Sequence, residues 1–270
     1  MRLCAFGGDA RMLGALNAAK RAGWNTDYIC CEQDDIPKSA DALLLPWPHS
    51  FLDGLLSGTQ LEKERILARL PACRCAIHGG GVDAGELSMA EKTLNPAQDE
   101  TFLRANACLT AEGAVARAMG RQGVALLDAV CVITGFGRIG QELAVRLVAM
   151  HAFVVVCARS EAQMRMAHDV GAHPVPLSEI ASACRRADVI FNTVPAHVLG
   201  KAALERIPEG TMVIELASPP YGMNIELARH MGVSVFMESG LPGRYAPQSA
   251  GAALFHALER AMEEGGERHG

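Results

Sequence analysis

Apolar runs of strand length alternate with helix-length segments in the first part of the chain. This alternation is typical of a parallel sheet flanked by helices, because parallel strands are joined by long crossovers that are usually helical. The pattern therefore predicts an α/β domain over residues 1–100. Its expected strands are residues 2–8, 26–31, 40–46 and 73–81, and its expected helices are residues 10–23 and 59–70.

A second and longer series of apolar runs begins at Ala129. Helix-length segments again fill the gaps, so we expect a doubly wound parallel sheet in residues 128–245. The predicted fold class is α/β, with two Rossmann-like doubly wound parallel-sheet domains. The expected strands of the second domain are residues 130–134, 153–158, 173–177, 188–194, 211–217 and 233–238.

Two further helices are predicted outside these series. Residues 93–100 end the first alternation with an Asn-Pro pair, and residues 101–121 follow as a linking helix whose alanines suit close packing between domains. Residues 247–264 carry apolar side chains near one face, as an amphipathic helix does. We expect this last helix to pack back on the first domain, which makes that domain discontinuous in sequence.

The turn after the first strand of the second domain carries the pattern GxGxxG. In a dinucleotide-binding domain the first glycine permits the tight turn, the second admits the pyrophosphate, and the third lets the helix pack on the strand. The helix N-terminus adds its partial positive charge. Because the pattern follows an apolar strand and opens a helix, it predicts a true dinucleotide-binding domain, the alternative being a purely structural turn. The expected cofactor-binding residues are Gly135, Phe136, Gly137, Arg138, Ile139 and Gly140.

The end of the second strand in this domain favours NADP over NAD. An NAD enzyme usually has an acidic residue about 20 residues after the fingerprint, on the ribose hydroxyls. Here the strand is followed by Arg159 and Ser160, and a guanidinium with a hydroxyl suits a 2′-phosphate. The alternatives are NAD and an arginine that merely caps the loop. Two later strand ends are expected beside the nicotinamide, and they contribute Thr193, Val194, Pro195 and Ala217.

Composition narrows the classes of function. The chain has 270 residues, half of them hydrophobic, and its net charge of −5 gives no basic surface for nucleic acid. No apolar run reaches the ~18 residues of a membrane span, and the start does not have the pattern of a signal peptide. The nine cysteines form no CxxC pair and accompany no HExxH motif. We therefore expect reduced core cysteines in a cytosolic protein, and no metal site.

Motifs spread over the chain, in order, share one resemblance. They are GGDAR at residues 7–11, NxxxTAEGA at 106–114, GFGRIG at 135–140, ARS at 158–160, NTVP at 192–195, LASPP at 216–220 and GLPGxxAPxxAG at 240–251. Together they resemble the family of dipicolinate synthase A subunits. The resemblance implies an NAD(P)-dependent oxidoreductase that works with a smaller flavoprotein-like B subunit in the mother-cell cytoplasm of a sporulating bacterium. It implies oxidation of a dihydrodipicolinate, or hydroxy-tetrahydrodipicolinate, precursor from the lysine pathway to pyridine-2,6-dicarboxylate.

A dicarboxylate substrate needs cationic groups in its site. Arg11, at the start of a helix, and Arg244 are the candidates for the two carboxylates. For Arg11 the alternative is a solvated side chain next to a helix cap by Asp9. Gly80 and Ser218, both in strand-end turns, are the other residues expected to bind the substrate.

Two rival classes stay open. A D-2-hydroxyacid dehydrogenase shares the GxGRIG turn, but residues 217–222 and 240–247 lack its arginine and histidine in register. A non-catalytic NADP-binding scaffold that activates a partner protein is the other, because no decisive acid–base pair is visible. Glu112 is the one candidate for the proton acceptor, with a helix cap as its alternative role. The alanine-rich linking helix would also suit a homodimer.

Overall fold

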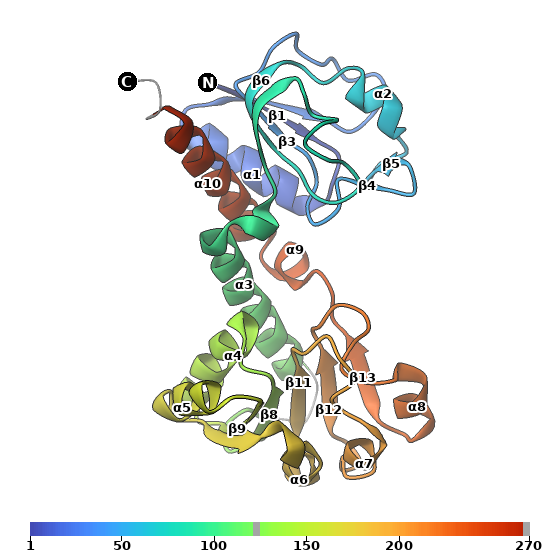
Figure 1. Cartoon of the computed structure of the whole chain (residues 1–270), viewed down its shortest axis with the longest axis vertical. Helices are drawn as coiled ribbons and strands as arrows, with labels where there is room; N and C mark the ends of the chain where they lie inside the picture. Colours follow the sequence, from blue (N-terminus) through green and yellow to red (C-terminus); the bar gives the residue numbers. More distant parts are fainter. Residues whose placement is uncertain (121–124, 267–270) are drawn as a thin grey trace. The chain divides into compact units, whose positions relative to one another are not determined.

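The computed structural model describes residues 1–120 and 125–266 and divides into two compact units. The first unit comprises Met1–Asn106 with the segment from Pro242 onward, and the second comprises Ala107–Leu241. Each unit contains a parallel sheet with helices around it (Figure 1). The predicted α/β class with two Rossmann-like sheets is therefore confirmed. Arg121, the end of the predicted linking helix, lies outside the described residues.

The main sheet of the first unit has five strands, and all of its pairings are parallel. Its strands are β1 (Arg2–Phe6), β2 (Asn25–Ile29), β3 (Ala42–Leu44), β6 (Cys73–Ile77) and β7 (Ala90–Leu94). The order β2-β1-β3-β6-β7 means that the chain winds first to one side of β1 and then to the other. The carboxyl ends of β1 and β3 therefore form the topological switch point, where ligands of such sheets bind.

The C-terminal helix α10 (Pro247–Gly266) lies beside α1 (Ala10–Arg21) in the first unit (Figure 1). Glycines bring the two backbones together. A Cβ on Gly251 would lie 2.1 Å from the carbonyl oxygen of Arg11, and a Cβ on Gly14 would lie 2.4 Å from that of Pro247. Leu254, Leu258 and other apolar residues of α10 complete the core of this unit.

Several small elements of the first unit differ from what the hydrophobic pattern predicts. A two-stranded hairpin of β4 (Phe51–Leu52) and β5 (Leu55–Leu56) follows β3, and the helix expected over residues 59–70 is only α2 (Lys63–Leu67). The edge strand β7 has the sequence AEKTL, which has no apolar run because it pairs with one neighbour only. A further short helix, α9 (Leu241–Tyr245), precedes α10.

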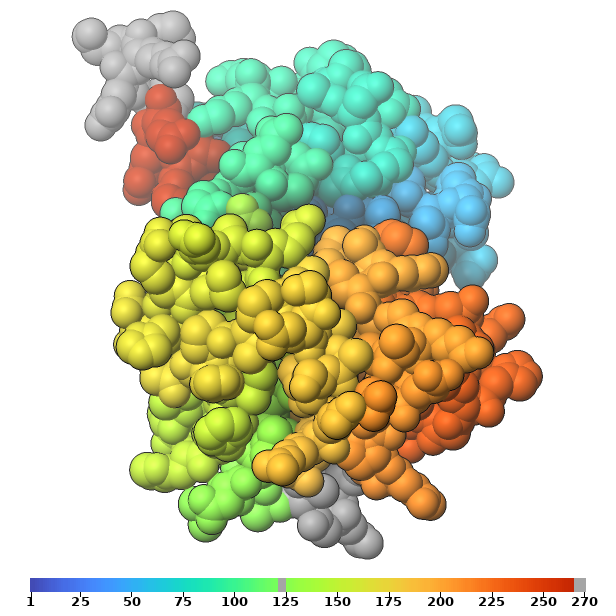
Figure 2. Space-filling model, turned by 60° about the horizontal axis from the view of Figure 1, so that its bottom comes forward, coloured from blue at the N-terminus to red at the C-terminus, as the bar shows by residue number. Residues whose placement is uncertain are grey.

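The second unit is a six-stranded parallel sheet in the order β10-β9-β8-β11-β12-β13. Its strands are β8 (Val130–Thr134), β9 (Phe153–Ala158), β10 (His173–Pro176), β11 (Val189–Asn192), β12 (Met212–Glu215) and β13 (Ser234–Met237). This is the 3-2-1-4-5-6 order of dinucleotide-binding domains. Its helices include α4 (Arg138–Ala149), α5 (Glu161–Asp169), α6 (Ile180–Ala183), α7 (Lys201–Leu204) and α8 (Ile225–His230). Figure 2 shows the surface that the yellow and orange segments of this unit form.

The helix α3 (Glu100–Met119) contributes to both cores. Phe102 packs in the core of the first unit, whereas Ala111, Ala114 and Ala118 are fully buried in the core of the second. The division of the chain falls inside this helix, at residues 106 and 107. The small side chains that the sequence shows here serve close packing of α3 within the second unit.

The described residues bear on three expectations, which concern membrane spans, metal sites and cysteines. No helix among residues 1–120 and 125–266 is long and apolar enough to cross a membrane. Within the same ranges no group of three potential ligand side chains is arranged to hold a metal ion. All nine cysteines are free thiols, and six of them are buried.

The contact of α1 with α10 predicts that Gly251→Ala destabilises the protein by about 1–3 kcal/mol, because the added methyl meets backbone atoms that cannot rotate away. Chemical denaturation would measure this loss. Gly200→Ala is the matched control, since a Cβ there meets nothing within 4 Å; its cost should stay within about 1 kcal/mol. Equal losses in the two variants would contradict this packing.

Candidate dinucleotide and substrate sites

The three glycines of the fingerprint turn in the second unit have three different surroundings. Gly135 has a φ of +83°, and a Cβ there would lie 2.6 Å from Cγ2 of Val194. A Cβ on Gly140 would lie 2.5 Å from the carbonyl oxygen of Gly135, so helix α4 packs directly on the turn. Around Gly137, by contrast, a Cβ would meet nothing within 4 Å. The turn therefore leaves space at the one glycine that faces a pyrophosphate in dinucleotide-binding domains.

The N-terminus of α4 provides donors at this space. Gly137 is the N-cap residue, and no side chain caps the helix there. The first turn contains no acidic residue and carries the exposed Arg138. Unpaired N–H groups and the helix dipole favour an anion at such an end. The residues present thus fit a pyrophosphate.

Phe136 and Ile139, two other residues of the fingerprint, turn their side chains toward the core. Phe136 is 2% exposed, and Ile139 packs against the same cluster. The carbonyl oxygen of Phe136 accepts a hydrogen bond of 3.2 Å from Nε2 of Gln141. A cofactor would meet mainly the backbone of these two positions.

Arg159 and Ser160 follow the carboxyl end of β9, and both are exposed. Ser160 is the N-cap of α5, where its Oγ accepts a hydrogen bond of 3.2 Å from the N–H of Gln163. Within the described parts of the chain, the Arg159 guanidinium forms no ion pair. Its charge is available to a ligand, as a 2′-phosphate site requires.

A buried polar network joins the carboxyl ends of β8, β11 and β12. The hydroxyl of Thr134 donates to Oδ1 of Asn192, whose Nδ2 donates to Oε1 of Glu215 at 2.6 Å. Glu215 is 1% exposed and also accepts from the N–H groups of Ala217 at 2.9 Å and Gly222 at 2.9 Å. Burial raises the pKa of Glu215, and the hydrogen bonds from Asn192, Gly222 and Ala217 oppose that shift. The network fixes the two turns that follow β11 and β12.

These two turns hold the residues expected beside the nicotinamide. The Thr193 hydroxyl donates to the carbonyl oxygen of Thr134 at 2.7 Å, and Nδ2 of Asn192 donates to that of Val194 at 3.0 Å. Thr193 and Val194 also border Gly135, whereas Ala217 is tied to Glu215. Asn192 and Glu215 are not among the site residues that the sequence predicts. The sequence feature that could have identified them is a polar side chain at the end of an otherwise apolar strand.

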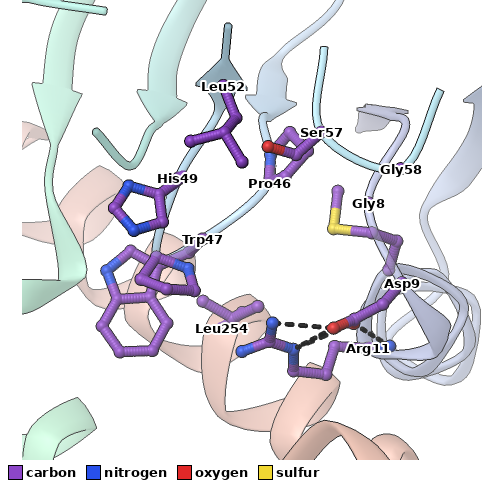
Figure 3. Close-up of a pocket in the computed structure, with 12 residues that line it drawn as sticks. Gly8, Asp9, Arg11, Pro46, Trp47, His49, Leu52, Ser57, Gly58 and Leu254 are labelled. Atoms are coloured by element: carbon purple, nitrogen blue, oxygen red, sulfur yellow. Dashed lines mark hydrogen bonds and ion pairs between the residues drawn. The ribbon is translucent and has the colours of Figure 1, made fainter. Parts of the chain in front are cut away.

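The first unit has its own pocket, of about 210 Å³, at the switch point of its sheet (Figure 3). The loop after β1 contributes Gly8 and Asp9 to its wall, and the start of α1 contributes Arg11 and Met12. The loop after β3 contributes residues 46–49. The rest of the wall consists of Leu52 in β4, Ser57 and Gly58 after β5, and Leu254 in α10. Its position at the carboxyl ends of β1 and β3 makes it the expected ligand site of this unit.

Arg11 and Asp9 form a pair in this pocket. The Asp9 carboxylate caps α1 by accepting from the N–H of Arg11 at 3.0 Å, and Nη2 of Arg11 lies 2.7 Å from Oδ2 of Asp9. Burial opposes ionisation of Asp9, but the hydrogen bonds and charge of Arg11 outweigh it and lower the pKa of the carboxyl. The Arg11 side chain is only 12% exposed, and its Nη1 has no partner in the described residues. Arg11 thus supports the cap and still directs a donor to the pocket.

The other predicted substrate residues lie elsewhere. Gly80 does not line the pocket, but its backbone supports the loop that does. Arg244 is exposed on α9, next to Gly243, where a Cβ would lie 3.1 Å from Nε of Arg11. Ser218 is exposed in the turn after β12 of the second unit.

Glu112, the predicted proton acceptor, lies on α3. Its Oε1 is 3.3 Å from Nη2 of Arg146, and its side chain is 55% exposed. Arg146 lies in the last turn of α4, about 12 Å along the helix axis from Arg138 at its start. The structure therefore places Glu112 away from the glycine turn.

Comparison with known proteins defines the class first. Residues 102–220 match the family model for the NAD binding domain of D-isomer specific 2-hydroxyacid dehydrogenase. With the glycine turn and the strand order, this makes the second unit similar to the dinucleotide-binding domains of dehydrogenases.

Whole-chain comparisons then define the family resemblance. The chain is 26% identical to the dipicolinate synthase A subunit of Bacillus subtilis (strain 168), over 98% of this chain and 96% of that protein. The crystal structure of the dipicolinate synthase A subunit from Bacillus halodurans is similar with a TM-score of 0.82 and 25% identity, over 97% of each chain. The predicted resemblance to the family of dipicolinate synthase A subunits is therefore confirmed. D-lactate dehydrogenase from Escherichia coli shares the fold, with a TM-score of 0.59 and 14% identity over 98% of each chain.

The different surroundings of two fingerprint glycines predict different effects of the same change. Gly137→Ala adds a methyl group in open space, so it should leave stability unchanged but obstruct the pyrophosphate and weaken dinucleotide affinity by tenfold or more, about 1.4 kcal/mol. Gly140→Ala forces a methyl against the backbone of Gly135 and should lower stability itself. Calorimetric titration and thermal melting separate the two effects. Unaltered dinucleotide affinity in Gly137→Ala would argue against this site.

Proposed function

We propose that this protein is the A subunit of a dipicolinate synthase, an NADP-dependent oxidoreductase that works together with a B subunit. It oxidises a dihydrodipicolinate, or hydroxy-tetrahydrodipicolinate, precursor to pyridine-2,6-dicarboxylate, in the cytoplasm of a sporulating bacterium. One combination of features carries the proposal. A dehydrogenase-type dinucleotide-binding unit occurs with a separate arginine-lined pocket, in a chain similar over its length to the dipicolinate synthase A subunit.

The second unit supplies the binding and orientation of the dinucleotide. The N-terminus of α4 at Gly137 would hold the pyrophosphate, and the turns fixed by Asn192 and Glu215 would contact the nicotinamide end of the dinucleotide. When bound, the oxidised nicotinamide accepts a hydride. Because the product ring is aromatic, the chain needs to contribute orientation and a proton acceptor rather than strong activation.

The pocket of the first unit holds the dicarboxylate. Its volume of about 210 Å³ equals the liquid volume of roughly seven waters at ~30 Å³ each, which suits a small metabolite and not a dinucleotide. Nη1 of Arg11 donates to one carboxylate, while Asp9 holds the guanidinium in place. Arg244, Gly80 and Ser218 stay predictions for the rest of the substrate site. Glu112 likewise stays a prediction for the proton acceptor.

NADP is the proposed form of the cofactor. The end of β9 presents an exposed guanidinium and a hydroxyl where an NAD enzyme usually has a carboxylate. A carboxylate would repel the 2′-phosphate of NADP, whereas Arg159 attracts it.

Arg159→Gln should weaken NADP binding by roughly tenfold to a hundredfold, the value of one hydrogen bond to a charged group, and leave NAD binding nearly unchanged. Isothermal titration with both dinucleotides measures this. Arg165→Gln is the control, because Arg165 lies on the helix that follows and its side chain is 72% exposed. If both dinucleotides lose the same affinity in Arg159→Gln, or neither does, the choice of NADP is wrong.

The activity itself is tested with the purified chain, alone and with a dipicolinate synthase B subunit. We expect NADP reduction and the ultraviolet absorbance of pyridine-2,6-dicarboxylate to appear together when the precursor is supplied. NADP binding without any turnover by the complex would favour the non-catalytic scaffold. Oxidation of a D-2-hydroxy acid in place of the precursor would favour the dehydrogenase alternative.

A further inference from the structure

Among the described residues that line the pocket of the first unit, three have titratable side chains: Asp9, Arg11 and His49. Arg11 stays a cation, because a guanidinium does not deprotonate in proteins. Asp9 accepts three hydrogen bonds from the side chain of Arg11 and one from its N–H, so its carboxylate is already committed. Of these three groups, His49 is therefore the one able to take a proton from a ligand. Figure 3 shows His49 and Trp47 across the pocket from Asp9 and Arg11.

His49 is carried by a loop that is held firmly in place. The N–H of Gly80 donates to the carbonyl oxygen of Pro48 at 2.8 Å, and the N–H of Ser50 donates to that of Gly80 at 2.8 Å. The fully buried Ser50 hydroxyl donates to the carbonyl oxygen of Pro46 at 2.9 Å and accepts from the N–H of Gly79 at 2.7 Å. These bonds clamp both sides of His49 to the end of β6. Catalytic side chains need such support to keep their geometry.

The imidazole of His49 is not held by any hydrogen bond from the described part of the chain. Neither ring nitrogen of His49 has a hydrogen-bond partner in residues 1–120 or 125–266, and the side chain is exposed. A Cβ on Gly80 would lie 3.0 Å from Nδ1, so the glycine leaves the ring its room. The other nearby histidine, His78, is buried and its Nδ1 already lies 3.0 Å from the carbonyl oxygen of Gly79. His49 is thus free to bond to a ligand through either ring nitrogen, whereas His78 is buried and has one ring nitrogen in a backbone contact.

We propose that His49 is the catalytic proton acceptor of this protein. The inference rests on the proposed function, since the proton comes from the substrate bound by Arg11. One C–H bond of the dihydropyridine ring breaks with both electrons, and a bound oxidised dinucleotide would accept that hydride. A second ring hydrogen leaves as a proton to a neutral imidazole nitrogen of His49, and its bonding pair completes the aromatic ring. The products are pyridine-2,6-dicarboxylate, the reduced dinucleotide and the imidazolium of His49. The negative charge of the bound dicarboxylate helps to stabilise this imidazolium.

The test compares four variants in the complex with the B subunit. His49→Asn should lower kcat by about 10²–10⁴-fold, the usual contribution of a general base. The affinity for pyridine-2,6-dicarboxylate, measured by calorimetry, should change far less than kcat. Added imidazole should restore part of the activity of His49→Ala. His256→Asn, at an exposed histidine on α10 of the same unit, should retain turnover. Glu112→Gln decides between His49 and the residue that the sequence predicts for the same role.

Each outcome bears on a distinct claim. Full activity of His49→Asn, or loss of activity in Glu112→Gln instead, would overturn this inference and leave the proposed function intact. A fall in dicarboxylate affinity as large as the fall in kcat, without rescue by imidazole, would make His49 a binding residue and overturn it as well. An inactive wild-type complex would overturn the proposed function, and the role of His49 with it. Matching melting curves establish that the variants fold.

Discussion

Parallel strand pairing is the constraint on which both candidate sites depend. Every pairing in the two main sheets is parallel, so the carboxyl ends of the strands in each sheet meet at one edge. Loops at that edge bring together residues that are distant in sequence. In the first unit this unites the loops after β1 and β3, and in the second unit the loops after β8, β9, β11 and β12. The two strand orders place a switch point in each sheet.

The edge of the second sheet is stabilised by polar groups that the strands themselves provide. A buried carboxylate such as Glu215 costs free energy unless it is hydrogen-bonded. Here Asn192, Ala217 and Gly222 donate to it, and a Cβ on Gly222 would lie 2.3 Å from the Asn192 side chain. These hydrogen bonds offset the cost of burying Glu215. They also fix the turns after β11 and β12 in one geometry. The turn after β11 borders the fingerprint glycine at 135 through Thr193 and Val194, so the network also supports the surroundings of the glycine turn.

Much of the fold follows from the sequence, because core strands are apolar on both faces. The expected bounds of β8 and β9 agree with the structure residue for residue, and the glycine turn stands out through its spacing. The edge strand β7 and the hairpin of β4 and β5, by contrast, could not be predicted from the sequence. Their stability comes from tertiary pairing, so their sequences carry no periodic signal.

The candidate sites were harder to predict than the fold. Arg11 is recognisable because it begins a helix after a strand. His49 lies in a proline-rich loop, and only the bonds of that loop to Gly79 and Gly80 bring it to the same pocket as Arg11. The ion pair of Glu112 with Arg146 is equally invisible in the sequence. Long-range contacts of single side chains have no pattern along the chain.

The most direct measurement is a crystal structure of the protein with NADP and pyridine-2,6-dicarboxylate. The account predicts the pyrophosphate at Gly137 on the N-terminus of α4, and a carboxylate of the product on Arg11 in the pocket of the first unit. A dinucleotide bound in that pocket, or a dicarboxylate bound away from Arg11, would contradict it.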